Sequence, residues 1–386
     1  MDLLLPDFCA IIPKGESVIP VYRPDLSGNE RAYVLECIDT GWVSSLGSFV
    51  SQFEGQLRQV TGAADVLTVS NGTVALHLAI HCLDIGPGDE VIVPTFTYIA
   101  SVNTIAQTGA MPVFADCRAG DWLVDPEDVE RRITPRTKAI MGVHLYGALC
   151  DMAALRRIAD KHGLKLIEDA AEALGGTLDG RQAGTFGDVA TFSFFGNKTV
   201  TTGEGGAVLT NDLALAHRLR IVKAQGMSQT RHYWHEELGF NYRMTNIQAA
   251  IGVAQMERLD AILDRKREIA ATYRELLART PVIFQKLQPG IVGSDWLVSL
   301  LLPKGVDREA IMAFLSHLGI ETRPVFYCAH TMPMYVKLPC EGLETSLDIA
   351  ARGLSLPSFP GLSEGDLLRV VEGLKAALDD QGNGQV

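Results

Sequence analysis

The sequence is poor in cysteine and in positive charge. Its seven cysteines are scattered and form no Cys-x-x-Cys pair, which is typical of a protein kept reduced in the cytoplasm. Acidic residues outnumber basic residues by 46 to 34, and the formal net charge is −12. Proteins that bind nucleic acid or an anionic membrane surface are usually basic, so this balance argues against both functions.

Targeting segments and common cofactor motifs are also missing. The first residues lack the basic segment and long apolar core of a signal peptide, and we expect no transmembrane span. Neither Gly-x-Gly-x-x-Gly nor Gly-x-x-x-x-Gly-Lys-Ser/Thr occurs, which disfavours a dinucleotide-dependent oxidoreductase and a P-loop hydrolase. His77 and His81 are four residues apart, but Leu78 stands where a His-Glu-x-x-His zinc motif needs glutamate. His232 and His235 lie in an expected loop, and we predict no metal site.

The chain does have the length and composition of a large folded core. It has 386 residues, 47% hydrophobic and 21% charged, which predicts a large α/β domain with a smaller one. Between residues 66 and 167, apolar runs alternate with helical patterns, as in βαβ units of a mostly parallel sheet. Proline and glycine turns follow a helical region that ends near residue 277. We predict an N-terminal arm (1–18), a large domain (19–280) and a small α+β domain (281–386), with a disordered end from residue 379.

The most unusual stretch is Thr191–Gly206, where a lysine lies between two apolar runs. One run ends at Ser193, Lys198 follows five residues later, and a glycine-rich turn leads into the second run. A buried lysine loses its proton readily, and a neutral amine attacks an aldehyde. Lys198 is therefore a candidate Schiff-base lysine for pyridoxal phosphate, with an ordinary loop lysine as the alternative.

Polar or aromatic residues follow several of the predicted strands, where open α/β sheets bind ligands. Ser70–Thr73 precedes a helix, and its backbone N–H groups would form an anion site. Glu168 and Asp169 end an apolar run, and a buried carboxylate there would need a cation such as a protonated pyridine nitrogen. Tyr98 could stack on a cofactor ring. An ordinary capped helix, solvated acids and core packing are the respective alternatives.

The order of these features resembles that of pyridoxal-phosphate-dependent aminotransferases of fold type I. More narrowly, the chain is similar to the DegT/DnrJ/EryC1/StrS family, which acts on nucleotide-linked keto-sugars. The similarity runs from Ile19 to Pro357, and its most specific segments are Ser70–Thr73, Phe192–Gly206 and Asn241–Thr245. It implies a large, mostly parallel α/β/α domain followed by a smaller C-terminal α+β domain.

The resemblance also implies a role for individual residues. Lys198 would be the Schiff-base lysine and proton shuttle, and Asp169 would pair with the pyridinium nitrogen. The cofactor-binding set would also include Gly72, Thr73 and Ser193 at the phosphate, Tyr98 on the ring, Glu172, and Asn241 at the neighbouring subunit's cofactor. The active unit would then be a homodimer with shared sites. Glu172 replaces the glutamine or histidine of many members. Candidate substrate contacts are Arg243, Arg323 and His330.

The reaction implied by the family is a ping-pong transamination from L-glutamate, with 2-oxoglutarate released, to a nucleotide-linked 4-keto-6-deoxy sugar. Local similarity around Lys198 and His330 favours GDP-4-keto-6-deoxymannose. Another dTDP- or UDP-linked 3- or 4-keto sugar remains an alternative. A sugar dehydratase of the same fold is less favoured, since that branch carries histidine in place of the lysine. A non-catalytic regulator is also less favoured, because no added DNA-binding domain is visible.

Overall fold

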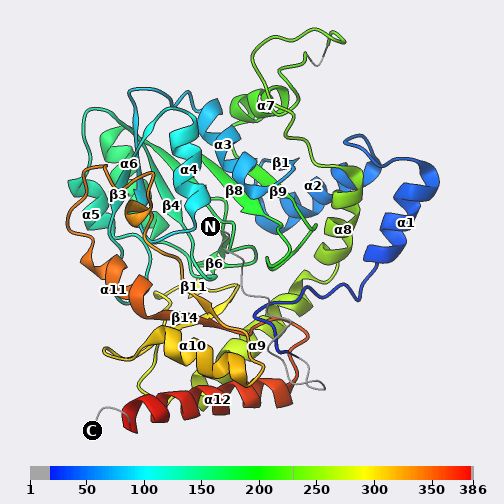
Figure 1. Cartoon of the computed structure of the whole chain (residues 1–386). Helices are drawn as coiled ribbons and strands as arrows, with labels where there is room; N and C mark the ends of the chain where they lie inside the picture. Colours follow the sequence, from blue (N-terminus) through cyan, green and yellow to red (C-terminus); the bar gives the residue numbers. More distant parts are fainter. Residues whose placement is uncertain (1–17, 229, 384–386) are drawn as a thin grey trace, which may run out of the picture.

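The computed structural model describes residues 18–228 and 230–383. Apart from Val18, the predicted N-terminal arm lies outside the described residues. A large lobe surrounds a seven-stranded sheet, and a smaller lobe lies below it in the view of Figure 1. In the described part of the chain, no helix is both long and apolar enough to cross a membrane.

The large sheet has the strand order β1-β9-β8-β5-β4-β2-β3. Its strands are β1 (Asp65–Val69), β2 (Glu90–Pro94), β3 (Met111–Ala115), β4 (Thr137–Val143), β5 (Lys165–Asp169), β8 (Val189–Ser193) and β9 (Gly206–Thr210). Only β9 runs antiparallel to its neighbours β8 and β1. Strands such as β2 and β9 are buried at every position, as expected where helices cover both faces of a sheet. The predicted mostly parallel α/β sheet is confirmed.

The helices of the large lobe surround this sheet, and most of them cover one of its two faces. They are α1 (Glu30–Thr40), α2 (Ser48–Thr61), α3 (Gly72–Cys82), α4 (Ile99–Gln107), α5 (Pro126–Arg131), α6 (Met152–His162), α7 (Leu213–Val222) and α8 (Asn246–Met256). Alternate residues of β1 enter different cores. Leu67 and Val69 pack in the core that includes α3, whereas Val66 packs in the core that includes α2 and α8. This alternation is the two-residue period of a strand.

The smaller lobe contains an antiparallel sheet of order β10-β12-β14-β13. Its strands are β10 (Ile283–Phe284), β12 (Val298–Leu301), β13 (Arg323–Pro324) and β14 (Gly353–Leu356). A second small sheet is formed by β6 (Thr177–Leu178), β7 (Arg181–Gln182) and β11 (Ile291–Val292). The helices of the smaller lobe are α10 (Arg308–His317), α11 (Glu344–Arg352) and α12 (Glu364–Asn383). The short helix η2 (Ala329–Thr331) instead lies against the large lobe, where the Ala329 N–H donates to the Thr95 carbonyl at 2.7 Å. The long helix α9 (Leu259–Leu276) descends from α8 into the smaller lobe (Figure 1).

Two local predictions need correction. The helical region near residues 245–277 is two helices, with Glu257 and Arg258 between them. The predicted disorder from Asp379 is wrong as far as Asn383, because α12 continues to that residue. The apolar side of α12 extends to Ala377, and packing over this length holds the last turns of the helix.

Candidate active site

A cavity of about 560 Å³ opens where the carboxyl ends of the parallel strands meet the smaller lobe. The large lobe supplies residues that follow β1, β2, β4, β5 and β8, and the smaller lobe supplies Trp296, Arg323 and Phe326. Eight of the predicted site residues line this one cavity: Gly72, Thr73, Tyr98, Asp169, Glu172, Ser193, Lys198 and Arg323. The topology thus brings together residues that are up to 251 positions apart, from 72 to 323.

Lys198 lies in the loop between β8 and β9, with its side chain 13% exposed. Its Nζ atom is 3.2 Å from Glu172 Oε1 and 3.9 Å from the centre of the Trp296 ring. The backbone on both sides of Lys198 is held by side chains from other elements. Trp296 Nε1 donates to the Asn197 carbonyl at 2.6 Å, and the Tyr22 hydroxyl donates to the Lys198 carbonyl at 2.6 Å. Lys198 is therefore fixed at the cavity wall, unlike an ordinary loop lysine.

Asp169 ends β5 and faces the cavity from a buried position, with 4% of its surface exposed. Ser101 Oγ donates to Oδ2 at 2.7 Å, and the Ala171 N–H donates to Oδ1 at 3.1 Å. Burial raises the pKa of Asp169, and these hydrogen bonds and the Lys198 charge only partly oppose that effect. A cation facing Asp169 from the cavity would restore its ionised form, because an opposite charge at short range favours the carboxylate.

Glu172 follows β5 by three residues and is equally buried. Its Oε2 atom accepts from the Tyr146 N–H at 2.9 Å, while Oε1 faces Lys198. Burial raises the pKa of Glu172, and the nearby Lys198 lowers it by a smaller amount. The short distance places this carboxyl where it can exchange a proton with the Lys198 amine.

Glu168, the other acid at this strand end, points away from Asp169. It accepts hydrogen bonds from the backbone N–H groups of Gly184, Phe186 and Gly187 and faces His144 Nε2 at 2.9 Å. His144 Nδ1 accepts from the Cys150 N–H at 3.1 Å, which places the imidazole proton on Nε2. The sequence pattern grouped Glu168 with Asp169, but only Asp169 belongs to the cavity wall. The sequence pattern gave no signal for His144, which also lines the cavity.

The predicted anion site forms where α3 begins. Asn71 caps the helix by accepting from the Val74 N–H at 3.0 Å. A Cβ atom on Gly72 would stand 2.8 Å from Ser193 Cβ, so glycine is needed for α3 to approach the end of β8 this closely. Gly72, Thr73 and Ser193 therefore face one corner of the cavity, where the helix N-terminus favours negative charge.

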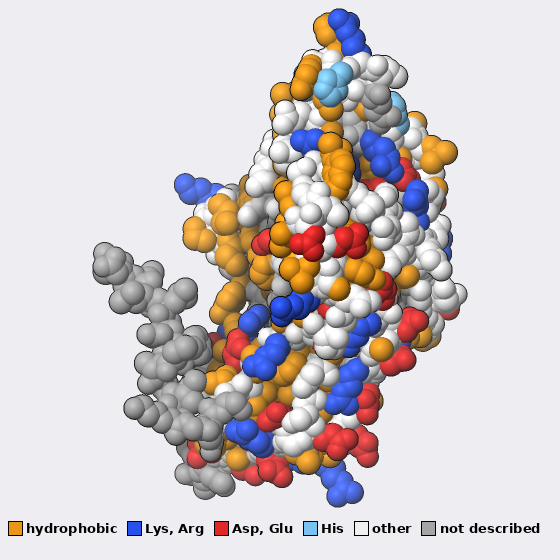
Figure 2. All heavy atoms as spheres, turned by 90° about the vertical axis from the view of Figure 1, so that its right-hand side faces the viewer, with side chains coloured by type: hydrophobic (Ala, Val, Ile, Leu, Met, Phe, Trp, Pro, Cys, Tyr) orange, Lys and Arg blue, Asp and Glu red, His pale blue; other side chains and the backbone are white. Residues whose placement is uncertain are grey.

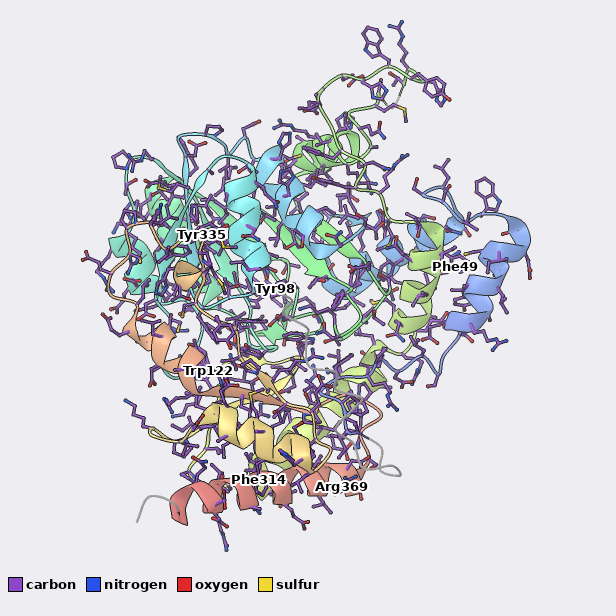
Figure 3. The ribbon with its side chains drawn as sticks, in the orientation of Figure 1. Phe49, Tyr98, Trp122, Phe314, Tyr335 and Arg369 are labelled. Atoms are coloured by element: carbon purple, nitrogen blue, oxygen red, sulfur yellow. The ribbon has the colours of Figure 1, made fainter. Side chains whose placement is uncertain are left out.

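Tyr98 presents an accessible ring at the cavity, with 57% of its surface exposed. It precedes α4 and lies between that helix and the smaller lobe (Figure 3). The Phe326 ring is 5.6 Å from it, centre to centre, and tilted by 52°. The exposed face of Tyr98 is available to stack against a planar ligand.

Three predicted residues do not line this cavity. The Arg243 Nε atom donates to Asn241 Oδ1 at 3.1 Å, and both residues lie at the base of a projecting segment, residues 223–242. His330 is set behind the wall, where its Nδ1 is 2.6 Å from Thr95 Oγ1. Burial lowers the pKa of His330. A direct substrate contact by His330 within this chain's cavity is therefore not supported. Arg323 lines the cavity while paired with Glu321 at 3.1 Å.

These walls fit pyridoxal phosphate in three respects. An anion corner at the start of α3 suits the phosphate, a buried acid lacking a cation suits the pyridine nitrogen, and a fixed lysine suits the aldehyde. Among the described residues, no group of three or more His, Cys, Asp or Glu side chains could hold a metal ion.

Comparison with known proteins gives consistent results. The model of the DegT/DnrJ/EryC1/StrS aminotransferase family matches residues 24–375. A GDP-perosamine synthase of Vibrio cholerae is 50% identical over 93% of this chain and 98% of its own length. The GDP-perosamine synthase of Escherichia coli O157:H7 is 48% identical over 94% of this chain and 99% of its own. A solved structure, the PLP-form of the putative sugar aminotransferase Spr1654 from Streptococcus pneumoniae, superposes with a TM-score of 0.90 at 26% identity, covering 94% and 99% of the two chains.

Proposed function

The chain belongs to the DegT/DnrJ/EryC1/StrS aminotransferase family, and from this premise we propose that it converts GDP-4-keto-6-deoxymannose into GDP-perosamine. It is a pyridoxal-phosphate-dependent sugar-nucleotide aminotransferase, and L-glutamate is the proposed amino donor. The choice of substrate rests on two GDP-perosamine synthases that are 50% and 48% identical to this chain over more than nine-tenths of its length. The fixed Lys198 amine beside a buried acid carries the choice of chemistry.

Each wall of the cavity has a proposed task. Gly72, Thr73 and Ser193 bind the cofactor phosphate, Tyr98 covers the ring, and Asp169 pairs with the ring nitrogen. When bound, pyridoxal phosphate supplies an electron sink for the carbanion at the amino acid Cα. Asp169 supports this role because its negative charge favours a protonated ring nitrogen opposite it. That cation in turn opposes the effect of burial, which raises the pKa of Asp169.

Lys198 Nζ is the proposed base that moves the proton from the donor Cα. An amine can do this only when it is neutral, and Glu172 Oε1 at 3.2 Å can accept the excess proton. The raised pKa of Glu172 suits this exchange, because a strongly acidic carboxyl would not hold the proton. The Trp296 ring closes one side of the amine and limits the access of water.

We further propose that the active unit is a homodimer with shared sites. Asn241 and Arg243 lie outside their own cavity, at the base of a segment that projects beyond α7 (Figure 1). Tyr233 and Leu238 on this segment are 81% and 80% exposed. Figure 2 shows further hydrophobic side chains on the face below this segment. Trp42 and Leu46, between α1 and α2, are also exposed. A second copy would cover these side chains and receive Asn241 at its cofactor.

Subunit mixing tests the shared site. Lys198→Ala and Asn241→Ala are each expected to be impaired, but mixing them allows hybrid dimers in which one of the two sites carries neither change. Recovered turnover after subunit exchange supports sharing, and mixing either variant with itself is the control. If exchange is verified by differently tagged subunits and no turnover returns, each site is complete within one chain.

The substrate is tested with protein that carries the aminated form of the cofactor. GDP-, dTDP- and UDP-linked 4-keto and 3-keto sugars are offered separately, and the products are identified by mass spectrometry and NMR. We expect the GDP-linked 4-keto sugar to react fastest, since a misplacement of the ketone near 1 Å costs about 100-fold. Reaction with only a 3-keto sugar, or only a UDP- or dTDP-linked sugar, would overturn the substrate and leave the family unchanged.

The proposed location is the cytoplasm. None of the six cysteines in the described part of the chain is in a disulfide, and such usage is typical of a reducing compartment.

A further inference from the structure

A second lysine, Lys266, is buried in α9 with 1% of its surface exposed. Within the described residues no carboxylate forms an ion pair with it. Its Nζ atom instead donates to the backbone carbonyls of Trp296 at 2.9 Å and Ser358 at 3.3 Å. Burial lowers its pKa to about 7, against a weaker opposing effect of Asp295. Burying an amine is costly unless hydrogen bonds compensate for the lost water.

The groups around Lys266 are the same groups that hold Lys198. Trp296, whose carbonyl accepts from Lys266, donates its indole N–H to the Asn197 carbonyl. Tyr22, whose ring centre is 5.1 Å from Lys266 Nζ, donates its hydroxyl to the Lys198 carbonyl. The peptide groups before and after Lys198 are therefore each fixed by the side chain of a residue that contacts Lys266, Trp296 through its carbonyl and Tyr22 through its ring.

Ser358, the second residue that accepts from Lys266, links this lysine to the segment that carries Tyr22. Its own N–H donates to the Val21 carbonyl at 3.1 Å. Val21 precedes Tyr22, so the residue whose carbonyl Lys266 holds is also hydrogen-bonded, through its own N–H, to the segment that carries the tyrosine. Three distant segments, near residues 21, 296 and 358, meet at one ammonium group. A methionine of similar length would leave two buried carbonyls without their donor.

We propose that Lys266 is a positioning residue that acts through Trp296 and Tyr22 to set where Lys198 Nζ stands in the cavity. The inference rests on the proposed role of Lys198 as the lysine that bonds the cofactor. It predicts that loss of Lys266 changes the environment and reach of Lys198 without removing any group that contacts substrate. A displacement near 1 Å at the reacting amine is enough for about a 100-fold loss of rate.

The test is Lys266→Met in the holoenzyme. We expect kcat to fall by about 10- to 100-fold with KM for the sugar nucleotide within about twofold, because alignment in the transition state is lost rather than binding. The pH midpoint of the visible absorbance of the bound cofactor should shift by roughly half a pH unit or more. The control is Tyr273→Phe, which removes another buried hydrogen-bond donor from α9. The Tyr273 hydroxyl donates to the Pro357 carbonyl at 2.9 Å, and among the described residues it has no hydrogen bond to Trp296, Tyr22 or the Lys198 loop. This variant should lose stability and keep the wild-type midpoint of the cofactor absorbance.

A cycle with Trp296→Phe tests the route. If Lys266 acts through Trp296, the double variant should lose less activity than the product of the single losses. An unchanged kcat and absorbance midpoint in Lys266→Met, with only a lower Tm, would overturn the proposal. Should Lys266→Met not fold, the midpoints of Tyr22→Phe and Trp296→Phe decide, and unchanged values in both would reject it. If Lys198→Ala retains the cofactor absorbance, the assignment of Lys198 fails instead.

Discussion

Glu168 and Asp169 are neighbours in β5 and both are buried, but their surroundings differ completely. Glu168 accepts from three backbone N–H groups and faces His144, all within the protein. Asp169 accepts two hydrogen bonds, and burial still raises its pKa. A strand turns successive side chains to opposite faces, so one acid joins the loop at residues 184–187 and the other joins the cavity. Glu168, with all its hydrogen bonds made inside the protein, stabilises the fold. Asp169, which has fewer partners and lies at the cavity, is available to pair with a ligand.

Removing the Lys198 side chain from the cavity wall should have the largest effect on turnover. Lys198→Ala is expected to lose all turnover and the visible absorbance of the bound cofactor, because Lys198 is the only lysine among the described residues that line the cavity. Absorbance spectra and a steady-state assay measure both results. The far-UV circular dichroism should not change. Substantial remaining activity would remove Lys198 from the reaction.

Asp169→Asn should have the next largest effect. The amide keeps the size of the side chain but removes the charge opposite the cofactor, and loss of one such preorganised group costs about 100- to 1,000-fold in kcat. The cofactor should remain attached to Lys198, so absorbance separates loss of chemistry from loss of binding. A variant with near wild-type kcat would show that the cavity acid is dispensable.

Glu168→Gln should show the opposite pattern. It replaces two of the acceptor positions by an amide NH₂ group and leaves buried backbone N–H groups poorly paired, at a cost of about 1–3 kcal/mol per unsatisfied group. Urea unfolding should record this loss, while kcat at a temperature well below Tm should fall far less than in Asp169→Asn. Equal losses of kcat in the two variants would erase the distinction between the two acids.

The smallest expected effect is a pH dependence of the cofactor-free protein. The pKa of Asp169 is raised by folding, so its contribution to stability is present at acid pH and is lost as pH rises through the folded-state pKa. Cofactor-free Asp169→Asn should therefore gain stability relative to wild type as pH rises above the ordinary aspartate pKa of about 4, by at most about 1.4 kcal/mol per pH unit. Urea midpoints at several pH values measure it. If the wild type instead becomes more stable relative to Asp169→Asn as pH rises, the raised pKa of Asp169 would be contradicted.

Short-range patterns were enough to predict much of the fold and part of the cavity wall. Continuous apolar runs separated by helical patterns correctly predicted a mostly parallel sheet. Asn71 caps its helix as expected. The residue pattern alone did not separate Glu168 from Asp169, because alternation places them on opposite faces but does not say which face meets a cavity. His144, Trp296 and Tyr22 were missed, since an isolated histidine or aromatic residue in an apolar run is usually part of the core.

By itself, the amino-acid sequence determined the α/β class, the family and the order of the chemical groups, because strand periods, helix caps and the Lys198 motif are local. Only the tertiary structure decided how those groups are supported. Trp296 and Tyr22 lie 99 and 176 residues from Asn197 and Lys198, the residues whose carbonyls they hold. Lys266 contacts Trp296 and Ser358 across 30 and 92 positions. Such contacts depend on the packing of the two lobes against each other, and no local pattern carries that information.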